Sequence, residues 1–497
     1  MNTGIYNKIF FNKPVILLRS FVMITLLFPN YKPLQAQTYN LQEVLDYAQN
    51  FSPEAMKNKT SKENKFWQWK TYKSNYKPQL VLNSIIPAFE NNNIPVLQED
   101  GSIIYRHVNR SQSWVNLSLE QSISVTGGKL FVSTNLSRID DFITKTNSYS
   151  SSPYYIGLEQ PLFSFNSLKW MNRIEPLKYE ESLKEYLEDL EKIAYSTTFR
   201  YFNLLIAQIN FGIAKININN ANSLYELGKK KFEMGKISKN ELLQLKFGFV
   251  SAQKSMSRAV LSQESAQLSL SSFTGIKNIG ASTLSLPDHL SEFIIDDSLA
   301  IRMALENSRR SVEFKRSILE AKQELERAKR ESGLNANLYL SYGTTNVAEK
   351  LLDIYNNPQA MRSANFGLTV PLLDWGRAKA KRKTANANLK LVEYTVKQEE
   401  VNFREEIVSE IEYFRMLKSL IGYTHVADNT AAERFDIAHN RYMAEDISLT
   451  EYNIALEEKD RAKQDYITAL RDYWLTFYSI RILTLYDFEK NRQIENK

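Results

Sequence analysis

Long stretches of the chain follow the hydrophobic spacing of packed α-helices. Residues 177–233 contain no proline, and positions seven apart are apolar with few exceptions, so they predict a helix of roughly 85 Å. Residues 242–273 place apolar residues in steps of three and four. Residues 377–442 and 452–483 repeat this layout in the second half. Sustained heptad spacing is typical of coiled-coil helices rather than of a globular surface helix.

A tight turn separates the two helices of each long pair. The two turns, residues 232–241 and 442–451, align at an offset of 210 positions. Each carries an S-x-x-E capping box, which predicts the start of the returning helix. Gly235 can adopt the left-handed backbone that ends the outgoing helix, whereas Glu445 stands at the equivalent position in the second half. The pattern therefore predicts two helical hairpins with tips near 235 and 445.

Shorter helices are expected at 41–50, at 53–76 and, as their counterpart in the second half, at 299–332. Period-two alternation marks six further segments as strands. These are residues 79–89, 114–124, 130–139, 154–162, 336–344 and 365–372. Strands of 9–11 residues are long enough to cross a membrane when tilted. Trp114, Tyr154, Tyr155 and Trp375 suit interfacial aromatic girdles. Alternation alone leaves a membrane barrel and a small soluble sheet equally open.

One element joins strand to helix in both halves, because residues 158–170 recur as 368–380. Its joint residues are Pro161, Ser164 and Asn166 in the first copy and Pro371, Asp374 and Gly376 in the second. The prolines fit where a strand stops, since proline cannot donate to the ladder. The serine and the aspartate stand at expected helix N-caps, and the asparagine and the glycine tolerate left-handed backbone. The repeat predicts two halves, 37–280 and 299–497, joined by a linker at 281–298.

The N-terminus and the composition indicate an exported protein without a catalytic centre. Basic residues precede an apolar run within residues 1–36, as in a secretory signal peptide. Cysteine is absent, and histidines and acidic residues show no metal-ligand spacing. No nucleophile–base pair or phosphate loop is recognisable, so we expect no enzyme, cofactor or metal. The net charge of +7 is dispersed along helical faces, which argues against nucleic-acid binding.

With the doubled joint and the two tip turns, the chain resembles the TolC-type outer-membrane efflux protein family over essentially its whole mature length. The resemblance implies a mainly α protein with a membrane β-barrel portion, assembled as a homotrimer in the outer membrane of a Gram-negative bacterium. Its helices would form a periplasmic tunnel that meets a periplasmic adaptor (membrane fusion) protein and an inner-membrane pump. Gate candidates by resemblance are Glu451, Tyr442 and their repeats Glu241 and Phe232; capping alone explains both glutamates equally well. Adaptor-docking candidates are Gly235, Lys236, Glu445 and Asp446.

Three functions remain open from the sequence. The first is a passive exit duct for small toxic compounds in a tripartite efflux system. The second is an exit duct for type I protein secretion, which the same duct would serve with other partners. The third is a soluble periplasmic coiled-coil scaffold, which osmotic shock would release without detergent.

The first half holds 47 more residues than the second, all in its strand region. By resemblance, four strands per subunit would close a 12-stranded trimeric barrel. The extra residues instead predict six strands per subunit and 18 in a trimer. Thr126, Gly127 and Gly128 would form a short periplasmic turn, and residues 90–113 and 140–153 would be long, polar extracellular connections. The rival arrangement folds residues 114–139 as an extracellular hairpin over a four-stranded subunit.

Overall fold

The computed structural model describes residues 38–277, 279, 282–287 and 293–495. The predicted signal peptide, residues 1–36, lies outside them. The described chain forms two compact units. The first comprises the described residues up to Tyr47 together with those of Arg200–His289, and the second comprises Ala48–Phe199 and the described residues from Phe293 onward. The helices α1 (Leu41–Phe51) and α3 (Ser167–Glu233) each contribute to both units.

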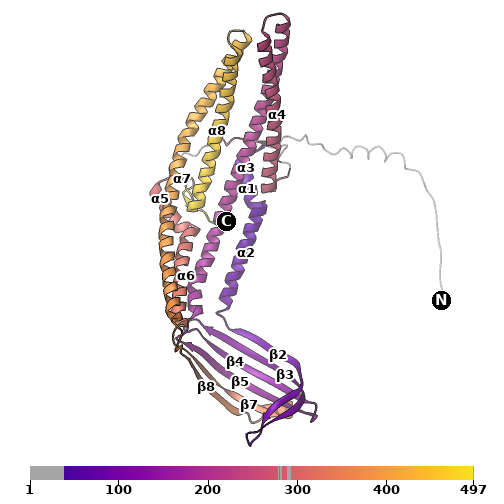
Figure 1. Ribbon diagram of the computed structural model, residues 1–497, viewed down its shortest axis with the longest axis vertical. Helices are drawn as coiled ribbons and strands as arrows, with labels where there is room; N and C mark the ends of the chain where they lie inside the picture. The colour runs from indigo at the N-terminus through magenta and orange to yellow at the C-terminus, as the bar shows by residue number, and fades with distance from the viewer. Residues whose placement is uncertain (1–37, 278, 280–281, 288–292, 496–497) are drawn as a thin grey trace, which may run out of the picture. The chain divides into compact units, whose positions relative to one another are not determined.

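The second unit contains one antiparallel sheet of six strands (Figure 1). In spatial order these are β2 (Gln79–Leu97), β3 (Ile103–Ile123), β4 (Gly128–Asp141), β5 (Thr146–Leu162), β7 (Asn335–Ala348) and β8 (Gln359–Thr369). Four strands from the first half therefore continue directly into two from the second, through the pairing of β5 with β7. A short 3₁₀ helix, Leu351–Tyr355, lies between β7 and β8.

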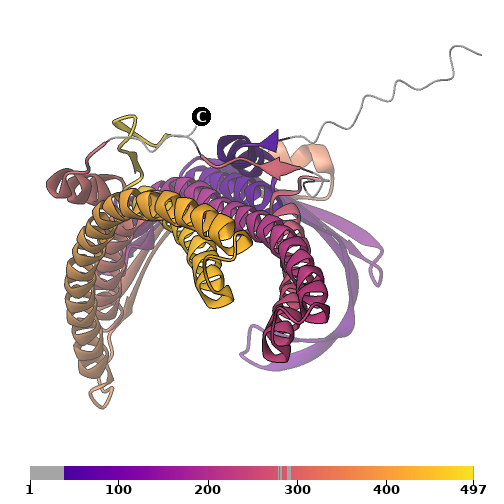
Figure 2. The same ribbon diagram turned by 90° about the horizontal axis from the view of Figure 1, so that it is seen from above.

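Helices of the second unit run to one end of this sheet. The helix α2 (Pro53–Ser74) leads into β2, α3 follows β5, α6 (Arg309–Glu331) leads into β7, and α7 (Arg377–Met443) follows β8. The helix α8 (Leu449–Thr484) returns alongside α7, and the two pack side by side (Figure 2). The predicted seam of α8 is buried at Tyr452, Ala455, Ala469, Tyr473 and Ile480. The chain then closes with a small hairpin of β9 (Tyr486–Asp487) and β10 (Arg492–Gln493).

The first unit pairs the C-terminal part of α3 with α4 (Lys239–Thr274). Its strands β1 (Thr38–Tyr39) and β6 (Thr283–Leu284) form a parallel pair, which places part of the predicted linker 281–298 in this unit. The fully buried Tyr201 shares its one hydroxyl hydrogen between the carbonyl oxygens of Ser285 (2.6 Å) and Tyr39 (3.0 Å). These bonds fasten both small strands to α3.

Two helix predictions differ from the structure, one in its starting residue and one in its continuity. The helix expected from residue 177 begins ten residues earlier, at Ser167, and contains Pro176. The proline lies in its third turn, so the helix continues through a residue that sequence reasoning treated as a boundary. The helix expected at 299–332 is two helices, α5 (Asp297–Asn307) and α6. Ser308 ends the first and caps the second by accepting from the backbone N–H of Ser311 (3.3 Å).

The predicted long connections at 90–113 and 140–153 were also wrong. Most of residues 90–113 belongs to β2 and β3, which stay paired up to Leu97 opposite Ile103. Likewise, β4 and β5 pair up to Asp141 opposite Thr146. Cross-strand pairing of backbone groups keeps these polar stretches extended although they lack apolar alternation. The rival extracellular hairpin is wrong as well, because residues 114–139 pair on both sides within the sheet.

The helices are long but polar. Across the described part of the chain, no helix has the length and apolarity needed to cross a bilayer.

Candidate functional site

The two faces of the six-stranded sheet differ in chemistry. Straight across the strands, Leu80 lies opposite Leu119, which lies opposite Val132 and then Ile156. Three residues further along, on the other face, Asn83, Asn116 and Asn135 form a row. Eleven large apolar residues on the first face are more than one-third exposed: Leu80, Leu82, Leu117, Leu119, Leu130, Val132, Ile156, Leu340, Tyr342, Phe366 and Leu368. We call the face that carries these residues the apolar face, and the face that carries the asparagine row the polar face.

Apolar side chains dominate this face in the part of the sheet nearest the helices. On β3 they span residues 115–123, and beyond them the same face carries Ser113 opposite Arg138 and Ser111 opposite Asp140, with the exposed Phe89 of β2 also opposite Ser111. An apolar band about nine residues tall, with mainly polar residues beyond it, matches the 9–11 residues that a tilted strand needs to cross a bilayer.

The polar face holds aromatic residues as well. Phe131 lies 5.7 Å from Tyr155 and 6.3 Å from Tyr339 between ring centroids, and the Tyr155 and Tyr339 hydroxyls share a short hydrogen bond. Trp114 lies on this face too, opposite Ile85 and Ser137. The prediction that Trp114 and Tyr155 belong to an outward girdle is therefore wrong. Tyr154, beside Tyr342, remains on the apolar face.

The first strand-to-helix joint differs from the sequence prediction. Ser164 does not cap α3: its hydroxyl donates to Oδ1 of Asn335, at the start of β7 (2.9 Å). Asn166 is the cap, since its Oδ1 accepts from the backbone N–H of Lys169 (3.0 Å). Its Nδ2 donates to the carbonyl oxygens of Ser124 and Val125, which ties the β3–β4 turn to the helix. The left-handed residue is Phe163, at φ +64°, rather than Asn166.

The second joint agrees more closely with expectation. Pro371 lies two residues after the end of β8, whereas Pro161 lies one residue before the end of β5. Gly376 is left-handed at φ +85°, and Trp375 before it is left-handed too. The Asp374 carboxylate accepts from the backbone N–H of Ala378 (2.7 Å) and of Gly376 (2.9 Å), and these bonds lower its pKa. Asp374 therefore caps α7 from two residues before the N-cap position.

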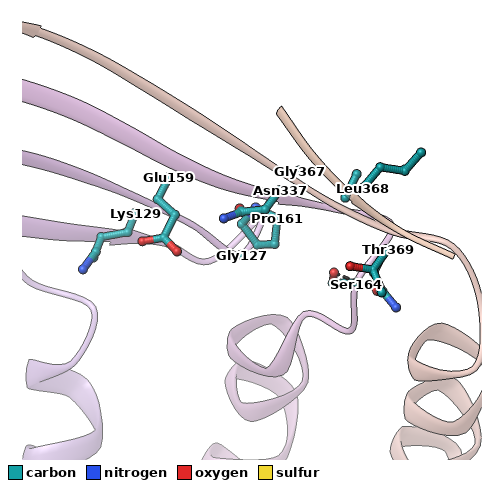
Figure 3. Close-up of a pocket in the computed structure, with 11 residues that line it drawn as sticks. Gly127, Lys129, Glu159, Pro161, Ser164, Asn337, Gly367, Leu368 and Thr369 are labelled. Atoms are coloured by element: carbon teal, nitrogen blue, oxygen red, sulfur yellow. Dashed lines mark hydrogen bonds between the residues drawn. The ribbon is translucent and has the colours of Figure 1, made fainter. Parts of the chain in front are cut away.

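The two joints border an open pocket at the helix end of the sheet (Figure 3). Gly127, Pro161 and Ser164 come from the first half, and Gly367 and Thr369 come from the second. Lys129 and Glu159 lie on the same wall, opposite one another on β4 and β5. The doubled element thus brings both halves of the chain together at the helix end of the sheet.

Both hairpin tips end in the same hydrogen-bonded turn. The backbone N–H of Lys236 donates to Lys231, and that of Gly235 donates to Phe232. Asp446 and Glu445 repeat these bonds to Arg441 and Tyr442. This is the Schellman pattern, which requires a left-handed residue at its fifth position. Gly235 supplies it at φ +68° and Glu445 at φ +63°. Sequence reasoning did not foresee the ion pair of Arg441 with Asp446 (2.7 Å), which adds a tie at the second tip.

Strain at Glu445 makes a direct prediction. Replacing Glu445 with glycine should raise the free energy of unfolding of the second hairpin by about 0.5–1 kcal/mol, because a Cβ disfavours left-handed backbone. Denaturant unfolding followed by circular dichroism measures this difference. The matched control, Gly235→Glu, should lower stability at the first tip. A loss of stability in Glu445→Gly would show that the glutamate side chain contributes more than its backbone strain costs.

The four gate candidates lie beside these turns. The Glu451 carboxylate accepts from the backbone N–H of Ser448 (2.9 Å), and the Ser448 hydroxyl accepts from the N–H of Glu451 (3.2 Å). This is a complete capping box. At the first tip Ser238 accepts from the N–H of Glu241 (3.2 Å). Tyr442 stacks on the buried Tyr452, with centroids 5.2 Å apart, and Phe232 is exposed.

No group of three or more His, Cys, Asp or Glu side chains suited to a metal ion occurs among the described residues.

Comparisons with known proteins show which proteins share this sequence pattern and fold. Residues 115–276 match the family model of the outer membrane efflux protein. That family consists of transport proteins and not enzymes, as the sequence analysis expected. A comparison with curated proteins finds no match.

Solved structures share the fold over nearly the whole chain. The CmeC outer membrane channel of Campylobacter jejuni aligns with 16% identity and a TM-score of 0.64, covering 92% of this chain and 87% of that one. A membrane protein from Pseudomonas aeruginosa aligns with 13% identity and a TM-score of 0.65, covering 92% and 91%. The outer membrane protein VceC of Vibrio cholerae aligns with 13% identity and a TM-score of 0.62, covering 92% and 97%. Residues 115–276 therefore carry the outer membrane efflux protein domain, and the chain as a whole has the fold of TolC-type outer-membrane channels.

Proposed function

We propose that this protein is an efflux channel of the Gram-negative outer membrane, the passive exit duct of a tripartite system. The observation that carries the proposal is the sheet: one face is apolar and exposed over the height of a bilayer, and the other is polar. A membrane strand pairs its backbone within a closed barrel, turns apolar residues to lipid and turns polar residues to the lumen. A soluble scaffold would leave this apolar face in water.

The helices support assembly from several copies. In α4, exposed apolar residues recur at intervals of four, three, eleven and seven on a side that its buried residues do not use: Leu243, Phe247, Val250, Leu261 and Leu268. A second stripe on a long helix indicates a second helical neighbour. We infer a homotrimer in which each hairpin packs between two others and forms part of a periplasmic tunnel wall. The helices α3 and α7, of 67 residues each, are about 100 Å long.

The tips would be the periplasmic entrance of this duct. Tyr442 and Glu451, with Phe232 and Glu241, would narrow the entrance. The exposed turn residues Gly235, Lys236, Glu445 and Asp446 would meet a periplasmic adaptor that is coupled to an inner-membrane pump. The tight Schellman turns favour this assignment, because they present a short, ordered end to a partner.

Extraction and conductance test the proposal. The protein should resist osmotic shock, require detergent for release from outer membranes, and have the mass of a trimer in detergent. Inserted into planar bilayers, it should conduct ions without an energy source. Deletion of its gene should sensitise cells to small toxic compounds. Release by osmotic shock without detergent would instead identify a periplasmic scaffold, and an export defect in one protein without drug sensitivity would identify a secretion duct.

The gate assignment makes its own prediction. Replacing Tyr442 and Glu451 together with alanine should raise single-channel conductance, since two side chains leave the narrowed entrance. Ser448→Ala is the matched control, because it removes the same capping box and leaves both gate side chains in place. If Ser448→Ala raises conductance equally, the effect comes from a frayed helix. If the double variant only loses helix stability, Glu451 is a cap and not a gate residue.

A further inference from the structure

The sheet is left open at two edges that match each other. Among the residues that the structure describes, β2 pairs with β3 alone and β8 pairs with β7 alone. Apolar side chains of this face lie on both edge strands, where they are most exposed: Leu80 is 67% and Leu82 is 64% exposed on β2, and Phe366 is 62% and Leu368 is 57% exposed on β8. Open strand edges bearing apolar side chains are not tolerated in lipid. Something must cover both edges.

The strand directions allow one edge to cover the other in a second copy of the chain. The strand β2 runs away from the helix end of the sheet and β8 runs toward it, so the two would pair antiparallel. The first 11 residues of β2, 79–89, match β8 in length, and residues 79–85 precede the irregularity of β2 between Ile85 and Ala88. We propose that β2 of one subunit pairs with β8 of the next subunit, with Gln79 opposite Thr369. Three six-stranded subunits would then close an 18-stranded barrel. This inference rests on the proposed function as an outer-membrane channel.

Both faces select this register. With Gln79 opposite Thr369, Leu80 lies opposite Leu368 and Leu82 opposite Phe366, so the apolar rows continue from one subunit to the next. On the polar face, Asn83 lies opposite Asn365, which extends the row of Asn116 and Asn135. A slip of one residue would oppose Leu82 to Asn365 and reverse the faces. Only slips of two residues preserve them.

The stagger of the sheet distinguishes these remaining registers. Straight across from Gln79, the pairing passes through Glu120, Phe131, Gly157 and Ser341 and reaches Ser363, six residues before the end of β8. In the proposed register each subunit therefore contributes a stagger of six residues. Over three subunits this corresponds to a strand tilt of about 35° for a rise of about 3.3 Å and a strand spacing of about 4.8 Å. Membrane barrels tilt by about 35–45°.

The alternatives fit less well. A stagger of four residues lowers the tilt to about 25°, outside the usual range for membrane barrels. A stagger of eight keeps an acceptable tilt but places Gln79 opposite Pro371, beyond the end of β8, where no N–H is available for the ladder. It also opposes Asn83 to Gly367 and interrupts the polar row. The proposed register alone aligns the first residue of β2 with the last residue of β8 at the helix end of the sheet.

An 18-stranded wall changes the duct. Barrel diameter grows roughly linearly with strand number, and barrels of 16–18 strands leave an aqueous channel. The lumen would be lined by the polar face, with its rows of asparagine and serine. The barrel would therefore be a wide, polar mouth, and the helical part would set the size limit for substrates.

Disulfide cross-linking tests the register, because the chain contains no cysteine of its own. The double variant Leu82→Cys/Phe366→Cys should form a covalent dimer and trimer ladder on non-reducing gels after mild oxidation of purified trimers. Asn83→Cys/Asn365→Cys should do the same from the lumen side. Directly opposed residues in an antiparallel pair have Cα atoms about 4.5–5.5 Å apart, within disulfide range, whereas diagonal neighbours lie beyond it.

Matched pairs provide the controls. Leu82→Cys with Ala364→Cys reports a stagger of four, Leu82→Cys with Leu368→Cys reports a stagger of eight, and Leu82→Cys with Asn365→Cys lies on opposite faces. A ladder strongest in either slipped pair would overturn the register. A disulfide that forms within one chain and gives no ladder would overturn closure by copies.

The outcomes separate this inference from the proposed function. Each variant is checked for trimer mass and for conductance in planar bilayers before oxidation. A conducting trimer that cross-links at none of these pairs overturns the closure and leaves the channel proposal standing. A monomer that does not conduct overturns both.

Discussion

Replacing Arg481 with alanine is expected to destabilise the protein by about 3–5 kcal/mol, because it would leave two buried carboxylates without a partner. Arg481, on α8, binds both Glu191 oxygens, with Nε 2.7 Å from one and Nη2 2.9 Å from the other. Its Nη1 lies 2.6 Å from Asp487 of β9. The Arg481, Glu191 and Asp487 side chains are 16%, 4% and 7% exposed. This cluster joins α3, α8 and the C-terminal hairpin.

Denaturant unfolding followed by circular dichroism measures the loss. Arg415→Ala is the matched control, since Arg415 also pairs with carboxylates, Asp297 and Glu412, but in a much more exposed setting. Its loss should have a small effect. Neutralising Glu191 and Asp487 in the Arg481→Ala background should recover part of the stability. Equal effects of the two single variants would refute the role of burial.

The cluster also predicts a pH dependence. Burial raises the pKa of Asp487, but the Arg481 charge and the backbone N–H of Lys490 outweigh it, so the folded pKa lies below the usual value. A depressed carboxylate pKa stabilises the fold above the unfolded pKa, about 3.9 for an aspartate. This stability is lost as the pH falls through the folded pKa. The acid sensitivity should be weaker in Arg481→Ala than in the parent protein.

Arginine on the apolar face is expected to cost nearly as much. Leu117 lies within the apolar band on β3, two residues from its centre, and a charge near the bilayer midplane of a barrel costs about 2–4 kcal/mol. Leu117→Arg should lower the yield of folded trimer in outer membranes and the denaturant midpoint in lipid vesicles. Heat-modifiable mobility on gels measures the yield of folded trimer, and urea titration measures the denaturant midpoint.

The neighbouring residue is the control. Asn116 precedes Leu117 but lies on the polar face, beside a hollow lined by Asn83, Trp114 and Asn135. Asn116→Arg should therefore fold with normal yield and change only conductance or ion selectivity. If both arginines are equally tolerated, the apolar face does not contact lipid. If Asn116→Arg is the damaging one, the two faces have been assigned the wrong way round.

Much of the fold could be predicted from local sequence pattern. Heptad spacing predicted the long helices, and the capping serines Ser238 and Ser448 lie where the returning helices begin. Caps and periodic stripes depend on residues within a few positions of each other, so they are legible without tertiary structure. The count of six strands followed from the same logic, since 47 additional residues in alternating segments require an additional hairpin.

Errors arose where distant residues decide. Ser164 was predicted to cap α3, but Asn335, 171 positions away, takes its hydroxyl and Asn166 caps instead. Residues 90–113 looked like a polar loop because their apolar alternation stops. Cross-strand backbone pairing holds them in β2 and β3 nonetheless. Trp114 and Tyr155 were assigned outward because aromatic content does not reveal which face of a strand a residue occupies.

The helical hairpins, their tips, the doubled joint and the six strands of the large sheet could be predicted from the amino-acid sequence, because each depends on short-range spacing or on the repeat. The tertiary fold was needed to establish which strands are neighbours, how far each extends, and which residues share the apolar face. Strand register fixes these faces, since a shift of one residue moves every side chain of a strand to the opposite face. The matching edges of β2 and β8 became visible only once that register was known.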